Sequence, residues 1–297
     1  GALGLAVLGM TLSTLLNFGP QHAMAWMAPG TPAALGVGLL LATLRGTGRV
    51  WLQSMPVKKL IQALASGGGN ARKEGGGLLG GDQVALSVAV GPEARLALGP
   101  QASTKIYRAR GDESPACWSL DASVAAGGLL ASLPDPVCCF AGARYRQRQR
   151  IALAAGASLV WLDTLTCGRS ARGERWAFAS VDARTSVDRA GVPLVRDGLR
   201  LEAGRGLPLR ERFGDGEAIA TLIVVGPLVA PLAESLLANL AAAPAGGEPL
   251  VAASPLAGGA IVRIAACSPA AVTRWLRAQV LPALTPLLDH HPWDRKS

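Results

Sequence analysis

Four arginine side chains form the most regular pattern of charged residues in this 297-residue chain. Arg144, Arg146, Arg148 and Arg150 alternate with Tyr145, Gln147 and Gln149. Because successive side chains of a β-strand point to opposite faces, a strand here would place all four guanidinium groups on one face. Guanidinium groups pair well with carboxylates and phosphates, so this stripe predicts a docking surface for an acidic partner. The alternative is a strand face that is only solvated.

A second group of charged residues lies in a polar loop at residues 168–174, which contains Gly168 and Gly173. Its charged side chains are Arg169, Arg172 and Glu174. We expect this loop to contact a partner, as we do for the stripe that begins at Arg144. The alternative is an ion-paired surface loop, in which such pairs add little stability.

The same residue types do not favour an enzyme. Asp163 and Glu174 could serve as the acid and base of a glycosidase, but aromatic residues, at 4%, are too few for a sugar-binding platform. The only histidines are His22, His290 and His291, so a catalytic triad is implausible. The glycine-rich segment 66–81 lacks the Gly-Lys-Ser/Thr ending of a phosphate-binding loop. The sequence therefore predicts a binding protein without catalytic activity.

Composition limits the class of protein further. The formal net charge of +9, mostly from arginine, suits acidic partners such as nucleic acid, an anionic membrane surface or an acidic protein face. Five cysteines without a CxxC pair predict neither a disulfide framework nor a zinc site. Free thiols indicate a reducing compartment, so we expect a cytoplasmic protein. Residues 2–16 are apolar but short for a transmembrane helix, and no basic segment precedes them, so no membrane association is expected.

Short strands and tight turns dominate the expected secondary structure. From Asp82 onward, apolar runs recur about every dozen residues without intervening helices, which is typical of an antiparallel or layered all-β body. Ala190-Gly191 is a hairpin signal between two of these strands. Strands are expected at residues 84–90, 95–98, 103–108, 118–124, 129–133, 137–140, 144–150, 157–162, 175–181, 184–188, 194–201, 218–225, 251–254 and 260–265. Helices are expected at 231–241 and from Pro269, which follows Ser268 as a cap. The predicted fold is mainly β, with two helices near the C-terminus.

The segment before residue 75 has a different character. Residues 39–44 and 49–53 read as a hairpin around the turn 45–48, and a short helix and the glycine-rich tract follow. With its Val-Trp-Leu-Gln-Ser run, the region of about residues 35–80 resembles the C-terminal tail of a β-rich family with tryptophan attenuator-binding-like folds. We therefore divide the chain into a hydrophobic segment at 1–33, a hairpin and linker at 34–74, and a main domain at 75–297. A fused gene model across 66–77 is one interpretation of this boundary.

A series of landmarks in the main domain is distinctive for its order. They are Gly75-Gly76-Gly77, Gly81-Asp82, the run from Gln101 to Arg108, Leu133-Pro134-Asp135-Pro136, the Gln-Arg strand, Asp163, Gly168-Arg169 with Gly173-Glu174, Arg196-Asp197 and Gly226-Pro227. With these landmarks, residues 75–297 resemble the urease accessory protein UreD family, called UreH in some bacteria. Members of that family normally begin with further strands, so this domain would lack its first strands and leave an exposed sheet edge.

The resemblance implies a fold and a function. The fold would be a stacked, β-helix-like arrangement of sheets with two helices. The function would be that of a nickel-insertion chaperone, which is not an enzyme and binds apo-urease, UreF and, through UreF, the GTPase UreG. Nickel would be a transient cargo that passes through the complex to the urease active site.

The resemblance also implies candidate residues for a nickel path, in which oxygen ligands would bind weakly and exchange. Asp82, Ser103, Thr104, Asp163 and Asp197 match polar positions of the family's motifs and would lie at strand ends or beside glycine turns. They could face a shared interior. The alternative is that each caps a turn or pairs with an arginine.

A basic, β-rich nucleic-acid-binding module is the alternative function from a different class. It would use the arginine stripe, and its affinity would fall steeply with salt. The stripe's strand offers only Tyr145 for base stacking, however, and stacking is the usual platform for single strands. We therefore expect no nucleic acid among the partners.

Overall fold

The computed structural model describes residues 47–52, 77–100, 102–242, 246–288 and 293. All of them belong to the second of two compact units, which spans Gly38–Ser297. The predicted apolar segment 2–16, the first hairpin strand, the glycine-rich linker and the boundaries at 33 and 74 lie outside the described residues. The three-part division of the chain therefore stays a prediction.

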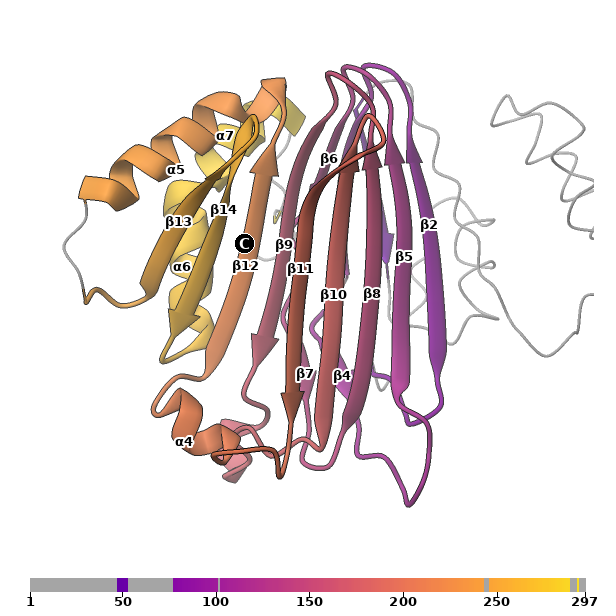
Figure 1. Cartoon of the computed structure of the whole chain (residues 1–297), viewed down its shortest axis with the longest axis vertical. Helices are drawn as coiled ribbons and strands as arrows, with labels where there is room; N and C mark the ends of the chain where they lie inside the picture. Colours follow the sequence, from indigo (N-terminus) through magenta and orange to yellow (C-terminus); the bar gives the residue numbers. More distant parts are fainter. Residues whose placement is uncertain (1–46, 53–76, 101, 243–245, 289–292, 294–297) are drawn as a thin grey trace, which may run out of the picture. The chain divides into compact units, whose positions relative to one another are not determined.

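The described residues form two β-sheets (Figure 1). The small sheet has five strands in the order β11-β10-β8-β5-β2, and the large sheet has nine, with β1-β3-β6-β9-β12-β14-β13 as its main path. In the small sheet the strands are β2 (Gln83–Val90), β5 (Ala116–Val124), β8 (Arg144–Leu153), β10 (Ser180–Arg189) and β11 (Val192–Glu202). In the large sheet they are β1 (Thr47–Leu52), β3 (Arg95–Pro100), β4 (Thr104–Ile106), β6 (Leu129–Ser132), β7 (Val137–Cys139), β9 (Ser158–Thr166), β12 (Ala218–Val225), β13 (Leu250–Leu256) and β14 (Gly259–Ala266).

The chain winds between the two sheets. It passes from β2 to β3, from β5 to β6 and from β8 to β9, so each turn of the winding adds a strand to both sheets. Strands that arrive in the same direction pair in parallel, as β2, β5, β8 and β10 do. Among the described strands, the antiparallel pairs are β10–β11 and those of the β9–β12–β14–β13 end. The predicted layered, β-helix-like stack is confirmed, whereas its first part is parallel rather than antiparallel.

An apolar core fills the space between the sheets. Strand residues alternate between buried and accessible, as in β8, where Tyr145, Gln147, Gln149, Ile151 and Leu153 are buried and the arginines face outward. The small sheet contributes Leu86, Leu120 and Ile151 to this core, and the large sheet contributes Leu130, Leu159 and Ile223. Full burial of one such side chain stabilises a fold by about 1.5–3 kcal/mol, so this layer is a main source of stability.

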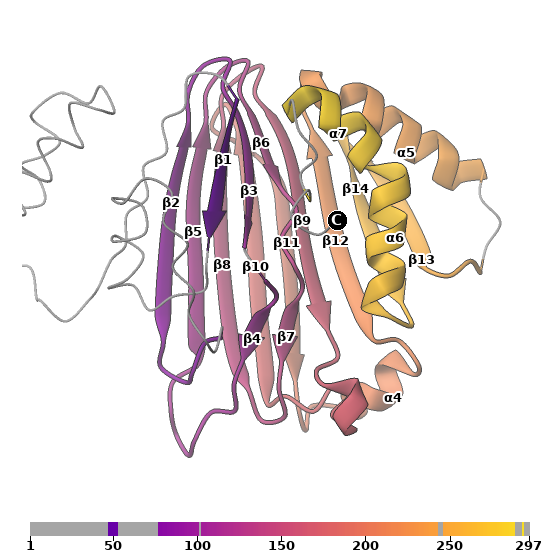
Figure 2. The same cartoon turned by 180° about the vertical axis from the view of Figure 1, so that it is seen from behind.

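Helices cover the outer face of β12, β14 and β13 (Figure 2). They are α5 (Ala230–Ala242), α6 (Pro269–Gln279) and α7 (Leu281–Leu288). The predicted cap of α6 is confirmed, because the Ser268 hydroxyl accepts a hydrogen bond from the Ala271 amide at 3.2 Å. The expected mainly β fold with helices near the C-terminus is thus confirmed. The second expected helix is divided, since α6 ends at Gln279 and α7 carries Pro286 in its interior.

Of two local predictions, the hairpin turn at Ala190-Gly191 is confirmed and the strand at 175–181 is wrong. The hairpin signal Ala190-Gly191 is confirmed, because both residues have positive φ and join the antiparallel strands β10 and β11. The strand expected at 175–181 is wrong, since β10 begins only at Ser180. Trp176 has a φ of 53°, which a strand cannot accommodate, and its indole N–H donates to the Gly216 carbonyl at 2.8 Å. That carbonyl follows the short helix α4 (Leu209–Phe213), which the sequence did not predict.

Candidate functional site

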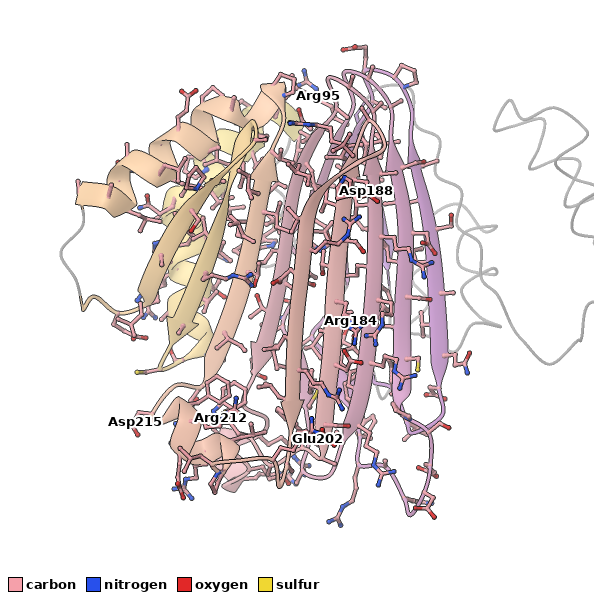
Figure 3. The ribbon with its side chains drawn as sticks, viewed as in Figure 1. Arg95, Arg184, Asp188, Glu202, Arg212 and Asp215 are labelled. Atoms are coloured by element: carbon pink, nitrogen blue, oxygen red, sulfur yellow. The ribbon has the colours of Figure 1, made fainter. Side chains whose placement is uncertain are left out.

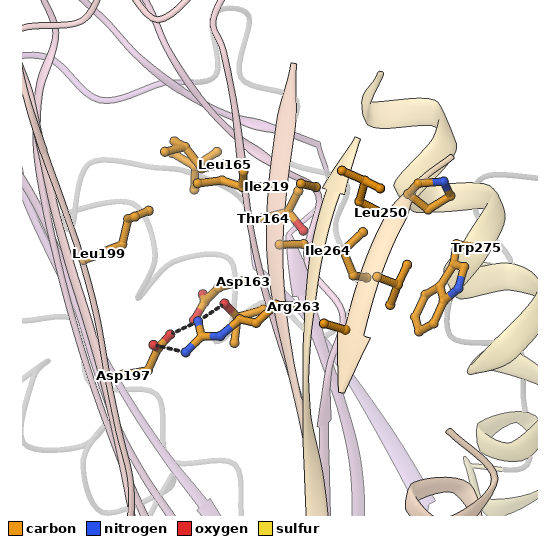
Figure 4. A pocket seen from close by; sticks show the side chains of 18 of the residues that line it. Asp163, Thr164, Leu165, Asp197, Leu199, Ile219, Leu250, Arg263, Ile264 and Trp275 are labelled. Carbon is orange, nitrogen blue, oxygen red and sulfur yellow. Dashed lines mark hydrogen bonds and ion pairs between the residues drawn. The ribbon is translucent and has the colours of Figure 1, made fainter. Parts of the chain in front are cut away.

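A cavity of about 980 Å³ lies at the side of the stack where the two sheets no longer match (Figure 4). The small sheet ends at β11, whereas the large sheet continues through β12 and β14 to β13. Asp163 of β9 and Asp197 of β11 both line the cavity. Two residues predicted to lie on a metal path therefore share one interior.

Asp163 accepts hydrogen bonds from four side chains. Its Oδ1 accepts from the amides of Gln147 and Gln149, at 2.9 and 3.1 Å. Its Oδ2 lies 3.0 Å from the Thr185 hydroxyl and 3.3 Å from the Trp161 indole nitrogen. The sequence suggested that β9 ends at Asp163, but the strand continues to Thr166. The carboxylate therefore points inward from the middle of a strand, where its neighbours are fixed.

Burial shifts the pKa values of Asp163 and of the neighbouring Tyr145. Burial raises the pKa of Asp163, and the hydrogen bonds from Gln149, Thr185, Gln147 and Trp161 offset part of that rise. Burial also raises the pKa of Tyr145, whose neutral hydroxyl donates to the Gln147 side-chain oxygen at 2.9 Å. The result is a connected polar cluster inside an otherwise apolar layer.

The raised pKa predicts a pH dependence of stability. A carboxyl group that binds its proton more tightly in the folded state adds stability as the pH falls through its folded pKa towards the unfolded value of about 3.9. Asp163→Asn removes this titration. We expect the free energy of unfolding of the native chain, relative to that of Asp163→Asn, to rise as the pH is lowered from 7.5 towards about 4, as measured by urea denaturation. Parallel pH profiles for the two proteins would contradict this expectation.

An ion pair stands at the cavity beside Asp163. Arg263 of β14 donates to both carboxylate oxygens of Asp197, at 2.6 and 3.0 Å, and to the Thr221 hydroxyl at 2.6 Å (Figure 4). The side chain of Asp197 is 16% exposed, whereas that of Arg263 is 53% exposed. The pair thus connects the edge of the small sheet to the extension of the large sheet.

The other residues predicted for the nickel path do not line this cavity. Asp82 lines a second pocket of about 740 Å³ together with Arg169 and Glu174. Ser103 and Thr104 are not among the described residues that line either cavity. The expectation that all five residues face one interior is therefore corrected, because only Asp163 and Asp197 do so. In the part of the chain that the structure describes, no three His, Cys, Asp or Glu side chains are grouped to hold a metal ion.

The charged loop at 168–174 is tied to the fold. Arg169 and Glu174 form a two-point ion pair, and the Glu174 carboxylate also accepts from the Ala141 amide at 3.1 Å. The hydrogen bonds from Arg169 hold the pKa of Glu174 below its usual range. The Arg169 guanidinium lies 4.1 Å from the centre of the Phe140 ring. Of the three predicted contact residues, Arg172 is exposed, whereas Arg169 and Glu174 are partly buried.

The arginine stripe lies on the outer face of the small sheet, as its spacing predicts. Arg146 and Arg150 are exposed, and Arg144 and Arg148 are partly buried. Carboxylates are interspersed on this face: Asp182 pairs with Arg148 and Arg184, and Asp121 lies 3.6 Å from Arg150. Figure 3 shows Arg184, Asp188 and Glu202 on the neighbouring strands. The face is therefore a mixed pattern of charges rather than a purely basic surface.

Several residues of the site were not predicted from the sequence. Gln147 and Gln149 were noted only as spacers between arginines, and Trp161, Thr185 and Arg263 were assigned no role. The alternation of β8 contained the missing signal, because it turns both glutamines inward when the arginines face outward. Their pairing with Asp163 joins different strands and is not visible in the sequence.

The fold and cavity together define a β-rich protein with a polar cluster between its two sheets. Residues 72–295 match the family model described as UreD urease accessory protein. The chain is 50% identical over 208 residues to the urease accessory protein UreD of Anaeromyxobacter sp., with 69% of each chain covered. It is 47% identical over 225 residues to UreD of Sorangium cellulosum, with 75% of this chain and 70% of the relative covered. It is also 35% identical over 153 residues to urease accessory protein D of Oryza sativa subsp. indica, with 52% and 50% covered. The chain belongs to the UreD family of urease accessory proteins.

In the part of the chain that the structure describes, no helix is long and apolar enough to cross a membrane.

Proposed function

We propose that this urease accessory protein is a nickel-insertion chaperone. It would hold apo-urease in a cytoplasmic complex with UreF and the GTPase UreG while nickel passes to the urease active site. Nickel would be a transient cargo, and the chain would supply binding surfaces rather than catalysis. Membership of the UreD family supports the maturation role. The observation that carries the finer proposal is the cavity shared by Asp163 and Asp197.

The hydrogen bonds that Asp163 accepts suit a nickel ion that passes through better than one that stays bound. Its carboxylate already accepts hydrogen bonds from Gln147, Gln149, Trp161 and Thr185. A nickel ion that approached it would have to replace one of these donors, which weakens binding and favours release. Hard oxygen ligands such as carboxylate and hydroxyl also bind nickel less tightly than imidazole or thiolate does. Asp197 would meet the ion where the cavity reaches the surface.

The outer face of the small sheet is the proposed contact for an acidic protein partner. Among the described residues, Arg146 is exposed and has no ion-pair partner, whereas Arg148 pairs with Asp182. Arg172 provides a further exposed cation on the loop at 168–174. A phosphate backbone is uniformly negative, so the carboxylates of Asp121, Asp182 and Asp188 would repel it. A protein whose acidic surface also carries some basic residues fits this mixed face better than nucleic acid does.

The test is co-purification of the full chain with the urease subunits and UreF of the same organism, followed by urease activity after nickel addition. Arg146→Glu should weaken retention of a partner about tenfold, since charge reversal in an interface costs about 1.4 kcal/mol or more. The matched control is Arg274→Glu on α6, where Arg274 is also exposed. Equal effects of the two variants would contradict the assigned face. Recovery of salt-sensitive nucleic acid in place of urease would overturn the proposed function.

A further inference from the structure

The unequal widths of the two sheets leave part of the large sheet uncovered. On the side that faces the small sheet, β13 and β14 present Leu250, Arg263 and Ala265, which line the cavity. The Leu250 side chain is 55% exposed. In the described part of the chain, no strand of the small sheet lies beyond β11 to cover them. The large sheet therefore extends beyond the small sheet on this side.

Among the described residues, no strand pairs with the edge of β11 that borders this gap. The Ala203 amide donates to the Ala179 carbonyl at 2.9 Å, so odd-numbered residues of this part of β11 face β10. By alternation, the amides of Gly198 and Arg200 point towards the free edge. An added Cβ at Gly198 would meet no atom within 4 Å. The middle of this edge is therefore accessible to another strand.

We propose that the β11 edge accepts an extended segment of a partner protein as a sixth strand of the small sheet. This segment would pair with the backbone around Gly198, and its inward side chains would cover Leu199, Leu250 and Ile219. The inference rests on the proposed function, because the partner would be a component of the urease assembly. Strand addition of this kind gains affinity from backbone hydrogen bonds and specificity from alternate side chains.

The charges at the edge indicate the chemistry of the segment. Arg196 and Arg200 flank Gly198 on the outer face. Each pairs with one carboxylate, of Asp188 and Glu202 respectively, yet their side chains stay 52% and 63% exposed and can meet a further carboxylate. A segment with acidic residues on its outward face and apolar residues on its inward face would match them. A second copy of this chain would not match, because antiparallel pairing about Gly198 would place Arg196 opposite the second copy's Arg200. Like charges opposite each other destabilise a strand pair.

Hydrogen exchange tests this assignment directly. The full chain is compared alone and in its purified complex with apo-urease and UreF. We expect the amides of Gly198 and Arg200 to exchange at least about tenfold more slowly in the complex, as newly hydrogen-bonded amides do. The internal control is Ser87 of β2. The bonds from Cys117 to Asp82 and from Ala125 to Val90 place the Ser87 amide on the side of β2 that faces away from β5, which is the opposite edge of the sheet in the described part of the chain. Exchange should not change there.

Two proline substitutions, one at each edge of the small sheet, provide a test variant and its matched control. Gly198→Pro removes an outward amide without breaking the β10 ladder, whereas Ser87→Pro does the same at the β2 edge. We expect Gly198→Pro to retain less than about a tenth of the partner and Ser87→Pro to retain all of it. A complex with unchanged exchange at Gly198 and Arg200 would overturn the inference and leave the proposed function standing. Protection of β11 that depends on the concentration of the isolated chain would overturn it in favour of self-association. Failure to form any complex would overturn both.

Discussion

Replacing Gly226 by alanine is expected to destabilise the fold by about 4 kcal/mol or more, because two separate penalties coincide. Gly226 has φ 108° and ψ 164°, a backbone conformation that is essentially restricted to glycine. An added Cβ would also lie 2.3 Å from the Ala157 carbonyl oxygen and 2.6 Å from the Ser158 Cα. Both are backbone atoms of the segment that opens β9, so the clash cannot be relieved by a rotamer change. A loss of this size consumes much of the 5–15 kcal/mol that typically stabilises a domain.

The contacts of Gly226 explain why its replacement would destabilise several elements of the fold. The residue follows β12, and its amide donates to the Gly258 carbonyl at 3.0 Å in the β13–β14 turn. Two residues later, the Leu228 amide donates to the Ser158 hydroxyl at 3.0 Å. The close approach at Gly226 thus joins β9, β12 and the β13–β14 hairpin. A shift there would disturb the packing of α5, which begins at Ala230.

Urea denaturation of Gly226→Ala and of Gly204→Ala separates the cost of a positive φ from the cost of the Cβ clash. Gly204 also has a positive φ, of 79°, but an added Cβ there would meet no atom within 4 Å. Gly204→Ala should therefore lose only the conformational part, about 1 kcal/mol. If Gly226→Ala were as stable as Gly204→Ala, the close backbone approach would not be what requires glycine at this corner.

Local patterns predicted the single elements of this fold better than their arrangement. The alternation at 144–150 correctly placed the arginines outside, because the period of a strand is a property of the chain itself. The same alternation is compatible with parallel or antiparallel neighbours, so it did not reveal the winding that makes β2, β5 and β8 parallel. The strand expected at 175–181 was wrong because Trp176 satisfies its indole through a residue 40 positions away.

The candidate site was likewise predictable from the sequence only in its separate residues and not in the contacts between them. Asp163 and Asp197 were chosen from the order of motifs, and the structure brings both to one cavity. Arg263, which binds Asp197, is 66 residues away in sequence and lies on a strand with an unremarkable apolar pattern. The glutamines around Asp163 come from a strand that was analysed for its opposite face. Contacts across sheets depend on register and winding, which a single sequence does not display.

Replacing Asp163 by alanine is expected to separate two roles of this residue when it is compared with Asp163→Asn. The alanine variant leaves the side-chain amides of Gln147 and Gln149 without their shared acceptor. Trp161 and Thr185 also lose a bond to Asp163 but keep the Gln149 side-chain oxygen, at 3.1 and 2.6 Å. Unsatisfied buried donors cost about 1–3 kcal/mol each, and partial rearrangement among them should leave a net loss of about 3 kcal/mol. Asparagine keeps the shape and one acceptor oxygen, so its loss should be about 1 kcal/mol. Urea denaturation measures both values.

Urease activation then tests the nickel path independently of folding. Asp163→Asn should keep the complex with apo-urease but lower the nickel-dependent urease activity at least about tenfold, because the neutral amide no longer attracts a divalent cation. Glu234→Gln, on the exposed side of α5, removes one carboxylate charge away from both the cavity and the proposed contact face and should leave activation unchanged. Full activation by a folded Asp163→Asn variant would show that the path does not use this carboxylate. Asp163 would then act only as the acceptor that holds Gln147, Gln149 and Thr185 between the sheets.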